Sequence, residues 1–133
     1  MFSVAVLLLL LAAGSGVNSE QLTQPESLTV RPGQPLTIRC QVSYSVSSYY
    51  TAWIRQPEGQ ALEWIGMLVT GTKYQKDSLS SKFSLSLDEA SKTVTLQGQN
   101  MQAGDSAVYY CARGGNDAFD YWGKGTVVTV SDS

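Results

Sequence analysis

The sequence predicts an all-β fold, a sandwich or a barrel of short strands, and three observations support this prediction. Apolar residues recur at every second position in several short runs, which is the period of a half-buried strand. Turn residues such as Pro and Gly separate these runs at short intervals. No segment of ten or more residues has a convincing helical period. Many short strands with such turns indicate a sandwich or a barrel.

Each predicted strand has its own signal. Residues 36–42 show the clearest alternation, and Trp53 and Arg55 share one face of the strand that follows. Serines alternate with apolar residues in 83–87, and only residues 101–105 could form a short helical turn. In chain order the predicted strands cover residues 28–30, 36–42, 52–56, 83–87, 93–97, 108–112 and 126–130.

Length and composition exclude several classes of function. The chain has 133 residues, which suits one domain, and its net charge is -2. Its nine Lys and Arg are scattered, so no basic stripe is available to bind nucleic acid. The absence of His excludes Ser–His and Cys–His catalysis and His-ligated zinc, and two Cys cannot form a four-thiolate metal site. We therefore expect no enzyme activity, no cofactor and no metal.

The first segment has the pattern of a secretory leader. Residues 4–13 form an apolar run of ten, too short for the ~20 residues that span a bilayer. Small residues follow, and Val17 and Ser19 suit the −3 and −1 positions of a cleavage site. The alternative, a buried core helix, lacks any amphipathic continuation. We predict a signal peptide over residues 1–19 and one folded domain over residues 20–133, in a compartment where disulfides persist.

Two cysteines, a tryptophan and a tyrosine are spaced in an informative way. Cys40 and Cys111 lie 71 positions apart on strand faces that should point inward, so they can form one disulfide; two free buried thiols are the alternative. Trp53 follows Cys40 by thirteen positions and shares the inward period. Tyr109 stands two residues before Cys111, where its hydroxyl can bond to upstream backbone.

The order Cys, Trp, Cys, together with the segment Asp-Ser-Ala-Val-Tyr-Tyr-Cys at 105–111, resembles an immunoglobulin variable domain from Gln21 to Ser131. Trp-Gly-Lys-Gly-Thr at 122–126 resembles the heavy-chain joining segment, and residues 53–56 and 62–66 resemble heavy-chain framework. The resemblance implies a variable-type β-sandwich of two antiparallel sheets with one inter-sheet disulfide. It also implies antigen binding as the heavy-chain variable domain of an antibody or B-cell receptor.

The resemblance assigns structural roles to five residues. Trp53 packs on the disulfide and Tyr109 forms the tyrosine corner. Arg55, on an inward face, needs a carboxylate, and Asp105 is the partner that the family implies, since an unpaired buried charge is costly. Lys82 is expected as a second cation at that end, although it could simply be solvated.

The same resemblance places three binding loops at one end, at residues 44–50, 68–73 and 113–121. Their Tyr, Ser, Gly, Asn and Thr content suits binding, although any single residue could be loop filler. Arg113 and Asp120 would close the base of the third loop, with Phe119 beneath it. The expected antigen-binding residues are Tyr44, Ser45, Ser47, Ser48, Tyr49, Tyr50, Leu68, Thr70, Gly71, Thr72, Lys73, Arg113, Gly114, Gly115, Asn116, Asp117, Phe119 and Asp120.

The outward face of the sheet that carries Trp53 is the expected partner surface. An exposed patch with two Trp is a partner site by default. In the family this face pairs with a light-chain variable domain, and Gln56 bonds across the interface. Heavy-chain domains that act alone usually replace the residues matching Leu62 and Trp64, but this chain keeps both. The expected interface residues are Ile54, Gln56, Leu62, Trp64, Tyr110 and Trp122.

One position departs from the family pattern. Gly98 falls where the alternation of Val94 and Leu96 asks for an inward apolar side chain. Glycine there leaves a void or lets its neighbours close in. We predict at this stage that Gly98→Met and Gly98→Leu are neutral to stabilising.

Two functional alternatives stay open on sequence grounds. A fixed-loop immunoglobulin-like cell-surface receptor, or a T-cell-receptor-type variable domain, would share the sandwich. In the antibody interpretation the partners are a light-chain variable domain and an antigen that the loops alone do not identify. The expected location is secreted, or the plasma-membrane exterior as part of a B-cell receptor, with membrane attachment only through a constant region outside this sequence.

Overall fold

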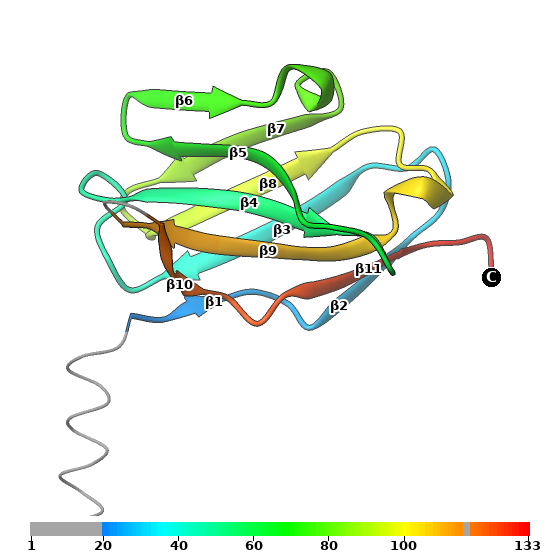
Figure 1. Ribbon diagram of the computed structural model, residues 1–133, viewed down its shortest axis with the longest axis horizontal. Helices are drawn as coiled ribbons and strands as arrows, with labels where there is room; N and C mark the ends of the chain where they lie inside the picture. Colours follow the sequence, from blue (N-terminus) through cyan, green and yellow to red (C-terminus); the bar gives the residue numbers. More distant parts are fainter. Residues whose placement is uncertain (1–19, 116–117) are drawn as a thin grey trace, which may run out of the picture.

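Two β-sheets packed face to face make up the protein in the computed structural model, which describes residues 20–115 and 118–133 (Figure 1). The strands are β1 (Leu22–Thr23), β2 (Ser27–Val30), β3 (Leu36–Val42), β4 (Tyr50–Gln56), β5 (Glu63–Val69), β6 (Thr72–Gln75), β7 (Phe83–Asp88), β8 (Thr93–Gly98), β9 (Ala107–Gly114), β10 (Phe119–Trp122) and β11 (Thr126–Val130). Two short 3₁₀ turns, η1 (Asp77–Leu79) and η2 (Ala103–Asp105), complete the described elements.

The smaller sheet has the order β1-β3-β8-β7, and the larger sheet has the order β2-β11-β9-β4-β5-β6, with β10 paired to β9. The predicted variable-type sandwich is therefore confirmed. One detail of the prediction is wrong: the pairing of β2 with β11 is parallel, so the larger sheet is mixed. The N-terminal segment leaves the smaller sheet after β1 and joins the edge of the larger sheet as β2, beside β11. Between β1 and β2 the Pro25 carbonyl accepts a hydrogen bond from the Thr126 hydroxyl at 2.6 Å.

The core lies between the two sheets and contains the predicted disulfide. Cys40 on β3 and Cys111 on β9 are bonded, with their Cα atoms 6.5 Å apart, so the alternative of two free thiols is excluded. Trp53 and Tyr109 are fully buried in the same apolar cluster. The inward positions of β3 and β8 alternate with exposed or half-buried positions, as their sequence period predicted.

All seven predicted strands are present, and η2 falls within the predicted helical turn. The sequence pattern missed β1, β5, β6, β10 and η1. Strand β5 lacks strict alternation because its outward side is also partly covered, and a register shift between Trp53 and Ile54 interrupts its pairing with β4. Strand β6 buries none of its side chains fully, so its backbone pairing with β5 leaves no apolar period.

The surroundings of Gly98 argue against a neutral or stabilising effect of a larger side chain at this position. A Cβ atom on this residue would lie 2.9 Å from the sulfur of Met101 and 3.0 Å from the ring of Phe83. Met101 and Phe83 are both buried, so the neighbours have closed in and no void remains. A larger side chain would overpack this part of the core and should destabilise the fold.

Candidate binding surface

The first predicted loop joins β3 to β4 and supplies both core and surface. Tyr44 and Val46 are buried, and the Tyr44 hydroxyl lies 2.6 Å from Oγ1 of Thr51. Burial raises the pKa of Tyr44 to about 12, although its hydrogen bond to Thr51 acts in the opposite direction. Tyr44 therefore belongs to the core, and its inclusion among the surface binding residues is wrong. Ser45, Ser47, Ser48 and Tyr49 are exposed, and Tyr50 is half-buried at the start of β4.

The second predicted loop is a tight β5–β6 hairpin. Its connection is only Thr70 and Gly71, and Gly71 has a φ of +86°, a left-handed conformation that favours glycine. Thr72 and Lys73 are exposed on β6, and the Lys73 ammonium lies 3.4 Å from the carbonyl of Leu85. Leu68 is buried in the main core, so its expected place in the binding surface is also wrong.

The third predicted loop is mostly paired strand. Arg113 and Gly114 end β9, and Phe119 and Asp120 begin β10. The amide of Gly115 donates to the carbonyl of Ala118 at 2.7 Å, which closes the hairpin. Asn116 and Asp117, also expected to bind, lie outside the described residues.

Arg113 and Asp120 form the expected ion pair at the base of this hairpin. Nε of Arg113 donates to Oδ1 of Asp120 at 3.1 Å, and a second guanidinium nitrogen contacts Oδ2. The hydrogen bond from Arg113 lowers the pKa of Asp120, and the same bond raises the pKa of Arg113. The guanidinium also lies 4.1 Å from the ring centre of Tyr49 and 4.7 Å from that of Tyr121. Arg113 thus ties the first loop to the third.

One exposed aromatic residue, on β6 near the start of β4, was not indicated by the sequence. Tyr74 on β6 is exposed, and its ring centre lies 6.2 Å from that of Tyr50. Burial raises the pKa of Tyr50, and the neighbouring Tyr74 adds to this shift. Strand β6 has no apolar period that could have indicated Tyr74. The available signal is that Tyr74 directly follows Lys73, the last residue of the second predicted loop.

The outward face of β4, β5, β9 and β10 carries the expected partner residues, with one correction. Ile54 is buried there, because Trp64, Met67 and Phe119 pack over the small cluster that it forms with Ala52 and Ala112. Ile54 therefore supports this face from below and is not displayed on it.

The other expected partner residues remain accessible. Leu62 and Trp122 are 52% and 42% exposed, Gln56 is exposed, and Trp64 and Tyr110 are half-buried. The rings of Tyr110 and Trp122 meet edge to face, with centres 5.8 Å apart. The Gln56 amide donates to the carbonyl of Gln60 at 3.0 Å. We call Gln56, Leu62, Trp64, Tyr110 and Trp122 the aromatic face.

A charge network holds the opposite end of the sandwich. Arg55 donates to Asp105 at 3.0 Å and to Glu63 at 2.8 Å. Lys82 reaches the other oxygen of Asp105 at 3.0 Å, so the interpretation of Lys82 as merely solvated is excluded. The Tyr109 hydroxyl donates to the Asp105 carbonyl at 2.6 Å, which confirms the tyrosine corner. Glu63, a second partner of Arg55, was not predicted.

Burial and pairing act in opposite directions on these charges. Burial alone would lower the pKa of Arg55, but its hydrogen bonds to Tyr109 and Glu63 raise it overall. Burial alone would raise the pKa of Asp105, but bonds from the Gln102 backbone and from Lys82 lower it overall. Both groups therefore stay charged, and their role is to fix the framework that positions the hairpins.

Sequence analysis also missed Gln24. Its amide donates to the carbonyl of Tyr109 and to the hydroxyl of Thr126, both at 2.8 Å. Its oxygen accepts from the backbone of Cys111 and Gly125, both at 3.2 Å. One side chain therefore bonds β9 to Gly125 and to the start of β11, and no local pattern in the sequence indicates it.

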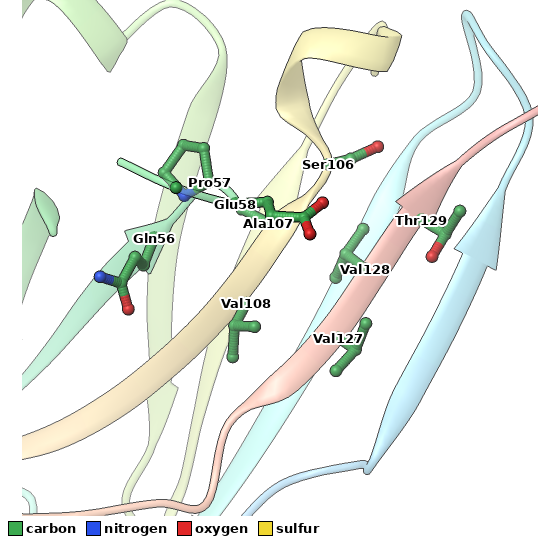
Figure 2. A pocket seen from close by; sticks show the side chains of 10 residues that line it. Gln56, Pro57, Glu58, Ser106, Ala107, Val108, Val127, Val128 and Thr129 are labelled. Atoms are coloured by element: carbon green, nitrogen blue, oxygen red, sulfur yellow. The ribbon is translucent and has the colours of Figure 1, made fainter. Parts of the chain in front are cut away.

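A hollow of about 640 Å³ lies at the end of the larger sheet away from the hairpins (Figure 2). Figure 2 shows Val127 and Thr129 on β11, Val108 on β9 beside them, and Gln56 at the end of β4 with Pro57 just after it. The hollow carries no titratable side chain besides Glu58.

Within residues 20–115 and 118–133, no group of three or more His, Cys, Asp or Glu could hold a metal ion. The same part of the chain contains no helix long and apolar enough to cross a membrane.

Comparison with known proteins agrees with this geometry. A sequence model of the immunoglobulin V-set domain matches residues 23–131. Two similar curated proteins from Xenopus laevis bear the names Ig heavy chain V region XIG14 and Ig heavy chain V region XIG8. They are 43% and 39% identical to this chain over 121 and 122 residues, and each match covers 88% of this chain and 90% of the relative.

Proposed function

Because this chain belongs to the immunoglobulin V-set family and is similar to heavy-chain V regions along most of its length, we propose that it binds antigen as one half of a pair with a light-chain variable domain. Its function is that of an antibody heavy-chain variable domain. The proposal adds the surfaces: the first loop and the β5–β6 and β9–β10 hairpins contact antigen, and the aromatic face contacts the light chain.

The observation that carries the pairing is the aromatic face itself. Two large apolar side chains, Leu62 and Trp122, are 52% and 42% exposed, and half-buried Trp64 and Tyr110 join them. Contiguous apolar surface of this kind marks a protein interface, and aromatic residues are enriched among the residues that dominate binding energy. The face lies on the sheet whose strands β4, β9 and β10 lead into the hairpins, so a partner docked there would add its own loops to the same end.

Antigen contact is supported by the side chains that the first loop and the β5–β6 hairpin expose. Tyr49, Tyr74 and the exposed serines of the first loop are rigid aromatic or small polar groups, the composition that paratopes use. The Arg113–Asp120 pair and the buried Tyr44 hold these residues on a fixed base. The domain therefore acts by binding, and we assign it no catalytic role.

Pairing is tested with Leu62→Glu, measured by sedimentation of the secreted chain mixed with light-chain variable domains from the same organism. We expect the Kd to rise at least about tenfold, because a charge would be buried in an apolar interface. Val127→Glu is the matched control, since Val127 is 49% exposed on β11 but lies outside the aromatic face. An unmodified chain that stays monomeric with every light chain would contradict the proposal.

We also propose that residues 1–19 are removed on secretion, which leaves Glu20 as the first residue. This proposal rests on the leader pattern in the sequence and on the extracellular role of the domain. Mass spectrometry of the secreted protein checks it. A secreted chain that still begins at Met1 would contradict it.

A further inference from the structure

A second hollow, of about 480 Å³, opens between the first loop and the β9–β10 hairpin. This volume is in the range of small-ligand pockets. Its lining includes Tyr49 and Tyr50 on one side and Gly114, Gly115 and Asp120 on the other, with Arg113. None of these residues belongs to the aromatic face, so the hollow stays distinct from the proposed light-chain interface.

The positive charge at this hollow is already satisfied. The guanidinium of Arg113 binds both carboxylate oxygens of Asp120 and lies 3.8 Å from a carboxylate oxygen of Glu20. Tyr49 and Tyr121 pack near it, and its side chain is only 11% exposed. A ligand that enters the hollow therefore finds little free guanidinium to bind.

Negative charge exceeds positive charge around this guanidinium, because two carboxylates, Asp120 and Glu20, pair with Arg113 alone. The side chain of Asp120 is 40% exposed, against 11% for Arg113, so the carboxylate is the more accessible member of the pair. The Asp120 carboxylate accepts from Arg113 and from the backbone amides of Asp120 and Tyr121, and its exposed side can still be approached by a cation from solvent. Tyr49 is exposed and Tyr50 half-buried, and a tyrosine ring attracts a cation over its face.

We propose that this hollow recognises a cationic group of the antigen, the guanidinium or ammonium of an Arg or Lys side chain. Asp120 would accept its hydrogen bonds, and Tyr49 and Tyr50 would contact its alkyl stem and its charge. The inference deepens the proposed antigen binding and rests on it, because it names the chemistry that one part of the paratope selects.

The test is an NMR titration of the secreted protein with two small probes of similar length, butylguanidinium and butyrate, at equal ionic strength. Butylguanidinium should move the amide resonances of Gly114 and Gly115, whereas butyrate should not. Asp120→Asn should weaken butylguanidinium binding at least about fivefold, because a charge-assisted hydrogen bond is lost.

The matched control is Asp88→Asn, which removes another exposed carboxylate, on β7 in the other sheet, and should leave both titrations unchanged. Tyr49→Leu is a second variant that keeps Asp120 and should also weaken butylguanidinium binding, so the test does not depend on one hairpin variant folding. The proposal is overturned if the unmodified protein prefers butyrate, or if butylguanidinium leaves Gly114 and Gly115 unmoved. Light-chain pairing can succeed or fail independently, because it uses the aromatic face.

Discussion

Two arginines on neighbouring strands of one sheet, Arg55 and Arg113, have similar partners but different surroundings. Each forms an ion pair with an aspartate and lies near an aromatic ring, Phe83 for Arg55 and Tyr49 for Arg113. The partners of Arg55 are buried or half-buried framework residues from β5, η2 and β9. The partners of Arg113 are Glu20, Tyr49 of the first loop, and Asp120 and Tyr121 of β10. Its two carboxylate partners, Glu20 and Asp120, are 35% and 40% exposed.

This difference indicates that the Arg55 end and the Arg113 end of the sandwich have different roles. Around Arg55 the charges have lost their water, so every member of the network depends on the others. The Arg113 side chain is equally buried, at 11% exposed, but its carboxylate partners Asp120 and Glu20 are 40% and 35% exposed. Water therefore screens these pairs, and Glu20 stays beside the guanidinium when Asp120 is replaced. One end therefore fixes the sandwich, and the other can carry different residues without unfolding it.

The largest expected effect is at the buried end. Asp105→Ala would leave Arg55 and Lys82 without their shared carboxylate and would disturb the backbone that the Tyr109 hydroxyl binds. We expect a loss of about 3–5 kcal/mol in the free energy of unfolding, the usual cost of breaking a buried pair. Denaturant unfolding measures it, and a loss below about 1 kcal/mol would contradict the account of this network.

A smaller loss is expected at Gly98, beside the same end. Gly98→Leu should cost about 1–3 kcal/mol, because the new side chain must displace Met101 and the Phe83 ring. Gly104→Leu is the control, since an added Cβ there meets no atom within 4 Å. Thermal melts of the two variants should differ clearly, and equal melting temperatures would support the sequence-based expectation that a larger residue at Gly98 is neutral.

The third prediction concerns acid. The pKa values of Asp105 and Glu63 are held below the usual range near 4, so their contribution to stability is complete at neutral pH and is lost as the pH falls through these lowered values. Unfolding free energies between pH 7 and pH 2 should fall less steeply for a destabilised but folded Asp105→Asn variant. The same slope in both proteins would show that the pair does not drive acid sensitivity.

The smallest effect on the free energy of unfolding is expected at Asp120, in the β9–β10 hairpin. Asp120→Asn removes the exposed partner of Arg113 and should change the free energy of unfolding by less than about 1 kcal/mol. Comparing it with Asp105→Asn in the same denaturant series sharpens the contrast between the two ends. Equal losses would contradict it.

The sequence predicted the features that depend on a hydrophobic alternation or on the spacing of particular residues. Strands β3 and β8 have one buried face, so their alternation was legible, and the positions of Cys40, Trp53, Tyr109 and Cys111 indicated the core. The Arg113–Asp120 pair was expected from resemblance alone, and the structure contains it.

The remaining features depend on contacts between distant residues. Tyr44 was expected at the surface because it stands in a loop rich in serine, but Thr51 satisfies its hydroxyl inside the core. Ile54 faces outward as its strand predicts, yet Trp64 and Phe119 cover it. Gln24 bonds to Tyr109, 85 positions away, and no local pattern carries such a contact.

The contrast between a fixed framework and a replaceable hairpin end is tested most directly by sequencing transcripts of this chain type from single lymphocytes of the source organism. An antibody heavy chain should keep Arg55, Asp105 and the two cysteines in every cell, while the residues between Arg113 and Tyr121 differ in length and sequence from cell to cell. One constant sequence between Arg113 and Tyr121 in all cells would contradict the account and would favour a receptor with fixed loops.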